Sequence, residues 1–172
     1  MSSDSLNDLF ATYRRLRDCL KIAGRAVDTE NLRMLEGTEF VGQGKIQAAS
    51  WIEETRKTVD DLSVVALWAS FERYVIEYTQ KRAVPLGATD PVDFGKRLHK
   101  KVEDEVERWR ADEILDLFKG VIEPQQIGLA KQVKEYRDWV AHRNPNRLPS
   151  AQTEPKSTYN VLFTILDALE RT

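Results

Sequence analysis

Hydrophobic side chains recur every three or four positions over most of the chain, a period that predicts helices rather than strands. The pattern begins near Ser5 and Asp8, whose spacing resembles a helix-capping box, and continues to Val27. Residues 28–44 interrupt it with three glycines, so we expect a loop there with one helical turn. The first predicted element is therefore a long amphipathic helix.

The longest helical pattern covers residues 45–81 and becomes apolar on nearly every side over residues 62–78. A helix that is apolar all round usually lies in the centre of a bundle. Glu72 interrupts this stretch four residues after Trp68, so a carboxylate buried there needs a partner. We expect a structural salt bridge or hydrogen bond to a neighbouring helix, and the more specific alternative is a contact with Arg137.

The second half of the chain predicts four further helices. Asp90-Pro91 favours a helix start, because Asp can cap free N–H groups and Pro suits the first helical position. Apolar residues then mark one narrow stripe that we expect to be buried, namely Phe94, Leu98, Val102, Val106 and Trp109. A short helix over 111–119, a helix from Pro124 that finishes before Asn144-Pro145, and a last helix over 157–171 complete the pattern. We therefore expect an all-α bundle, one domain over residues 1–172 with a long central apolar helix.

Composition supports a helical protein that folds without cross-links. At 172 residues, with 31% charged and 41% hydrophobic residues, the chain can bury its own core. The single Cys19 cannot form a disulfide within the chain, and no apolar segment approaches the ~20 residues of a membrane span or resembles a signal peptide. We therefore expect a cytoplasmic protein without a membrane partner. One cysteine and two histidines make a zinc site unexpected, so any catalysis should need no metal and no other cofactor.

A net charge of −2 gives the chain no global cationic field of the kind that non-specific DNA-binding proteins display. A nucleic-acid partner would have to bind a local basic patch. The candidates are Arg14-Arg15-Arg17, Lys96-Arg97 with Lys100-Lys101, and Arg143 with Arg147. Solvated helix faces are the favoured interpretation of the first two patches, whereas the third borders the motif described next.

An arginine and a histidine separated by four residues, Arg137 and His142, lie where the predicted helix from Pro124 runs into a proline. A polar residue, Asp138, directly follows the arginine. The apolar helix also contains the run Trp68-Ala69-Ser70-Phe71-Glu72. Motif, run and helix order together resemble the HEPN superfamily of small all-α domains, whose hallmark is an arginine, four to six residues and a histidine.

The resemblance implies a metal-independent endoribonuclease with a toxin–antitoxin or phage-defence role, acting as a homodimer that brings two motifs into one cleft. An antitoxin protein is a further partner that it allows. RNA carries its own nucleophile, the 2′-hydroxyl, so His142 would transfer a proton and Arg137 would bind two phosphate oxygens. Asn144 would add a hydrogen bond to the substrate, with Arg143 and Arg147 as the bordering cations and Glu72 as structural support.

Helix geometry leaves alternatives open. Residues five apart differ by about 140° on a regular helix, so either the helix end distorts or two subunits pair to bring Arg137 and His142 together. Asp138 lies one turn before His142, where it would orient the imidazole, or it forms an ordinary surface ion pair. Active members often have Asn at that position, which favours as an alternative a catalytically inactive HEPN-like dimeric interaction or nucleotide-binding module. An unrelated helical structural protein is the second alternative.

Overall fold

The computed structural model of the protein describes residues 3–142, 148–149 and 151–172. Within these ranges the chain is all-α and contains no β-strand. The α-helices are α1 (Ser3–Asp28), α2 (Leu32–Leu35), α3 (Lys45–Ala83), α4 (Val92–Glu105), α5 (Ala111–Asp116), α6 (Pro124–His142) and α7 (Pro155–Glu170). Two 3-10 helices, η1 (Val84–Ala88) and η2 (Val106–Arg108), flank α4. The predicted fold class is confirmed.

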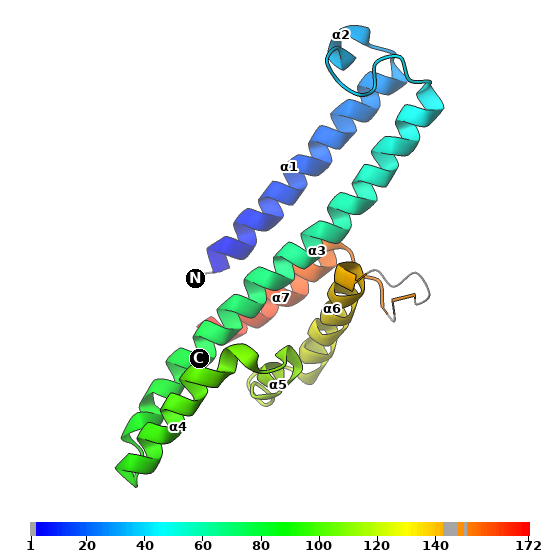
Figure 1. Ribbon diagram of the computed structural model, residues 1–172. Coiled ribbons are helices and arrows are strands. Elements are labelled where there is room, and N and C mark those ends of the chain that lie inside the picture. Colours follow the sequence, from blue (N-terminus) through cyan, green and yellow to red (C-terminus); the bar gives the residue numbers. More distant parts are fainter. Residues whose placement is uncertain (1–2, 143–147, 150) are drawn as a thin grey trace.

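Helix α3, with 39 residues, is the axis around which the other helices are arranged. Helix α1 runs antiparallel to the first part of α3, and α2 lies at the tip of this hairpin (Figure 1). Helices α6 and α7 contact the following part of α3, and α4 contacts its last part. None of the helices in the described ranges has both the length and the apolar character that a membrane crossing requires. Helix α3 is the long central helix that the sequence predicts.

The main core forms where α3 meets α6 and α7. Helix α3 contributes a buried face of Val64, Leu67, Trp68, Phe71 and Val75. Helix α6 buries one face, which consists of Ile127, Ala130, Val133, Tyr136 and Val140. A second and smaller cluster of Ala26, Val27, Leu35 and Ala48 closes the tip of the α1–α3 hairpin. The buried residues of α3 thus belong to two clusters, one in the main core and one at the hairpin tip.

The start of α1 differs from the predicted capping box. The chain is already helical at Ser3, so Ser5 lies inside the first turn instead of capping it. Its hydroxyl oxygen lies 3.1 Å from that of Ser70 on α3. Ser5 therefore ties α1 to the central helix, a contact between distant residues that spacing within α1 cannot reveal.

The predicted apolar stripe of α4 is wrong at its first position. Phe94 is 58% exposed, whereas its neighbour Gly95 is buried. A Cβ atom at Gly95 would lie 2.5 Å from the carbonyl oxygen of Leu86 in η1, so only glycine allows this approach. Close packing of α4 on η1 turns Phe94 outward.

Helix α5 is also shorter than predicted and ends at Asp116, before a turn that leads to Gly120.

Candidate functional site

Arg137 is a residue of α6, and its guanidinium group points toward the central helix α3. Three side chains hold this group in place. One terminal nitrogen, Nη2, donates to Glu72 Oε2 at 3.0 Å, and the other, Nη1, donates to Asp138 Oδ1 at 3.0 Å. The guanidinium carbon lies 5.7 Å from the centre of the Trp68 ring, within range of a cation–π interaction. The contact between Glu72 and Arg137, predicted as the more specific alternative, is therefore present.

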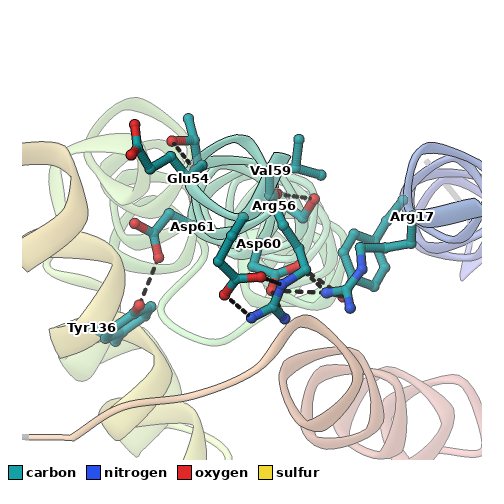
Figure 2. Close-up of polar contacts among 11 residues, drawn as sticks. Arg17, Glu54, Arg56, Val59, Asp60, Asp61 and Tyr136 are labelled. Atoms are coloured by element: carbon teal, nitrogen blue, oxygen red, sulfur yellow. Dashed lines mark hydrogen bonds and ion pairs between the residues drawn. The ribbon is translucent and has the colours of Figure 1, made fainter. Parts of the chain in front are cut away.

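Two polar contacts attach the motif segment of α6 to α3. Tyr136 donates a hydrogen bond to Asp61 at 2.7 Å (Figure 2), and the next residue, Arg137, forms the ion pair with Glu72. Both members of that ion pair are partly buried, with 25% of the Arg137 side chain and 33% of the Glu72 side chain exposed. Partial burial makes such charge-assisted bonds stronger than fully exposed surface pairs.

Replacing Glu72 with alanine should lower the free energy of unfolding by about 1–2 kcal/mol, because the partly buried Arg137 would lose a charged acceptor. Thermal and urea unfolding followed by circular dichroism measure this change. Glu103→Ala provides the matched control, since Glu103 is an exposed glutamate on α4. Equal stability of the Glu72→Ala protein and the control would contradict the stabilising role of the ion pair.

Asp138 interacts with cations of α6 rather than with the imidazole one turn later. Its carboxylate accepts hydrogen bonds from Lys134 at 2.9 Å and from Arg137 at 3.0 Å. Lys134 is 20% exposed and lies 4.0 Å from Asp112 of α5 as well. In the described residues no hydrogen bond joins Asp138 to His142, so the predicted orienting role is replaced by a contact with Arg137.

His142 is exposed, and α6 is helical through this residue. Because residues five apart on a regular helix differ by about 140°, the imidazole and the guanidinium group of Arg137 lie on different faces. No hydrogen bond joins Arg137 to His142 within residues 3–142. Within the described residues, one chain therefore does not bring Arg137 and His142 together through a distorted last turn.

Comparisons with protein-family models, with curated proteins and with solved structures return no match for this chain. Function is therefore inferred from the residues, their geometry and the motif resemblance.

The remaining predicted site residues have different outcomes. Arg143, Asn144 and Arg147, the predicted substrate-binding residues, lie outside the described residues. Of the apolar residues that flank the motif, Val140 is 5% exposed and belongs to the core. Trp139 is half-buried and stacks on Tyr136 with 5.8 Å between ring centres. Val140 therefore stabilises the monomer and offers no surface to a second subunit.

Two residues around Arg137 were not predicted as part of the site, although the sequence holds a signal for each. Trp68 precedes Glu72 by one helical turn, so both side chains reach the same guanidinium group from one face of α3. Lys134 precedes Asp138 by four residues, the spacing at which opposite charges pair on a helix.

Proposed function

We propose that the protein is a metal-independent endoribonuclease of the HEPN type that acts as a homodimer. The observation that carries this proposal is the contrast between the two motif residues. Arg137 is held in place by Glu72, Asp138 and Trp68, whereas the imidazole of His142 is exposed at the end of the same helix. A fixed cation and an accessible proton-transfer group are what cleavage of RNA through its own 2′-hydroxyl requires.

In the proposed reaction the 2′-oxygen attacks the adjacent phosphorus while the bond from phosphorus to the 5′-oxygen breaks. His142 takes the proton of the 2′-hydroxyl, and the leaving 5′-oxygen takes a proton from water. Arg137 binds the phosphate oxygens, where negative charge develops in the transition state. The products are one strand that ends in a 2′,3′-cyclic phosphate and one strand that begins with a 5′-hydroxyl.

Helix geometry favours a site that two subunits share. Arg137 and His142 of one chain face different directions, so Arg137 of one subunit would act with His142 of the other. A two-fold axis beside the ends of two α6 helices would create two such pairs in one cleft. Exposed Ala141 lies next to His142 and is small enough for close approach of a second helix.

Asp138→Asn should raise the rate of RNA cleavage several-fold. The carboxylate competes with substrate phosphate for Arg137, and an uncharged amide would compete less. Initial rates on a labelled oligoribonucleotide measure the effect. A fall in rate together with a shift of the pH profile to lower pH would instead restore the role in which Asp138 orients His142.

The second candidate function is a catalytically inactive HEPN-like dimeric module that binds a partner protein or a nucleotide. One observation favours it, since the guanidinium group of Arg137 already contacts two carboxylates, those of Glu72 and Asp138. A cation neutralised in this way attracts a phosphate less strongly. Growth arrest on expression in cells, absent for His142→Ala, would favour the enzyme, whereas equal growth of both strains would favour the module.

The proposed function is tested by incubating the purified protein with total RNA in the presence of EDTA. Cleavage should persist without divalent cations and should be lost in His142→Ala. His99→Ala is the matched control, because His99 is the other histidine of the chain and lies on α4, outside the motif. Cleavage that requires Mg²⁺, or that survives in His142→Ala, would contradict the proposal. A toxin–antitoxin or phage-defence role remains part of the same proposal.

A further inference from the structure

A cavity of about 700 Å³ lies between α1, α3 and the start of α7, away from Arg137. Its lining contains five basic residues and three acidic ones, although the whole chain carries a net charge of −2. The basic residues are Arg14, Arg17, Lys21, Arg56 and Lys156. The cavity thus concentrates positive charge contributed by three separate helices.

Two of the three carboxylates in the cavity are already engaged by cations. Asp60 accepts hydrogen bonds from Arg17 at 2.7 and 2.9 Å and lies 3.7 Å from Arg56 (Figure 2). Asp18 accepts a hydrogen bond from Lys21 at 2.9 Å, which holds the pKa of that carboxyl below its usual value. These pairs neutralise much of the charge of Arg17, Arg56 and Lys21, so the positive excess of the cavity rests on its unpaired cations.

Arg14 and Lys156 supply the cations that are available to a ligand. Both are exposed, and neither forms an ion pair in the part of the chain that the structure describes. Lys156 lies in the first turn of the 16-residue helix α7, and the N-cap residue before that turn, Glu154, makes no side-chain capping bond and is the third acidic residue of the lining. The positive end of the α7 dipole and the charges of Arg14 and Lys156 together outweigh this one carboxylate.

Aromatic rings line the same cavity. Phe10 and Tyr13 stack with 5.9 Å between ring centres, and both belong to the lining. Tyr13 donates a hydrogen bond to Asp60. The pKa of Tyr13 is raised, mainly because its hydroxyl is partly buried and secondly because of this bond. Aromatic faces beside a basic groove are the features with which proteins bind bases and phosphates of single-stranded nucleic acid.

Neighbouring residues of α3 connect the cavity to the motif. Asp60 faces the cavity, and the next residue, Asp61, faces Tyr136 on α6 (Figure 2). The chain that leaves α6 at His142 returns to the cavity at Glu154. The cavity and Tyr136 therefore flank one turn of the central helix, and Glu72, which binds Arg137, lies about three turns further along the same helix.

We infer that this cavity binds the phosphate backbone of the single-stranded RNA that is cut at His142, with Arg14 and Lys156 as its phosphate-binding side chains. The inference rests on the proposed function, because it assigns a second contact to the same substrate. The inference also gives different roles to the three arginines of the patch Arg14-Arg15-Arg17. Arg14 and Arg17 line the cavity, whereas Arg15 does not.

The test is the affinity of a fluorescent 2′-O-methyl oligoribonucleotide, which cannot be cleaved through its 2′-oxygen, measured by anisotropy. The double variant Arg14→Ala/Lys156→Ala should bind at least ~10-fold more weakly than the unmodified protein. The slope of log K against log salt should also fall by about 1.4, from two lost contacts at ~0.7 each for a single strand. Arg15→Ala/Lys57→Ala is the matched control, because it removes the same charge from exposed positions outside the cavity.

Equal affinity and equal salt slope for the two double variants would overturn the inference, as would failure of the unmodified protein to bind the oligonucleotide. Cleavage of ordinary RNA is assayed separately on the same proteins. If the protein binds through Arg14 and Lys156 but cuts no RNA, the cavity assignment stands and the proposed function fails. If it cuts RNA and both double variants bind alike, the proposed function stands and the cavity assignment fails. The unmodified protein and the two double variants should melt at the same temperature.

Discussion

Arg137→Ala and His142→Ala should each lower the rate of RNA cleavage by at least ~10²-fold, the usual effect of removing an electrostatic stabiliser or a general acid–base group. An equimolar mixture of the two inactive proteins should then recover about a quarter of the original rate. Half of the dimers in the mixture are mixed ones, and each mixed dimer regains one of its two shared Arg137–His142 pairs. Initial rates on a labelled RNA, after the subunits have exchanged, measure the recovery.

Two controls make the mixing result specific. Each variant is first mixed with itself, which should give no recovery, and subunit exchange is verified by light scattering and by a tagged subunit. A mixture that stays as inactive as its components, despite confirmed exchange, would show that Arg137 and His142 act within one chain. Protein that remains monomeric at micromolar concentration while it cleaves RNA would contradict the shared site in the same way.

Trp68→Ala should lower the free energy of unfolding by about 3–5 kcal/mol, the range for a fully buried large side chain that leaves a cavity. Trp68 is 0% exposed, and its ring lies 5.4 Å from that of Phe71. Its indole nitrogen is buried without a hydrogen bond to the described residues, so its effect on stability comes from packing. Urea unfolding followed by circular dichroism gives the value.

Trp51→Ala is the control for Trp68→Ala, since Trp51 lies on the same helix but is half-buried at the hairpin tip beside Phe40. It should cost clearly less than Trp68→Ala. In addition, Trp68→Ala removes the ring beneath Arg137, so cleavage should fall even at temperatures where the variant is folded. Equal destabilisation by both substitutions would mean that the main core does not centre on the Trp68 segment of α3.

Periodicity predicted most of this architecture because helices with one buried face are specified locally. The apolar segment of α3 lies in the main core as expected, and α6 packs on it with one face, from Ile127 to Val140. Glu72 was expected to need a partner if buried, and in the structure this partly buried carboxylate pairs with Arg137. Such features follow from spacing within one helix and from the cost of burying a charge.

Features that depend on contacts between distant segments were not predictable. The spacing of α4 favoured an inward Phe94, but close packing of Gly95 on η1 turned the helix. Helical spacing allowed Asp138 to reach His142, yet Lys134 and Arg137 hold its carboxylate. The basic cavity combines residues from α1, α3 and α7, which no single stretch of sequence brings together.

The central claim is that RNA is cut by its own 2′-hydroxyl with His142 as the proton-transfer group. The most direct test is mass spectrometry of the fragments from a defined oligoribonucleotide cut in EDTA. We predict 2′,3′-cyclic phosphate and 5′-hydroxyl ends, and no cut when the nucleotide before the cleavage site carries 2′-deoxyribose. Fragments with 5′-phosphate and 3′-hydroxyl ends, or continued cutting at the deoxyribose position, would contradict the account.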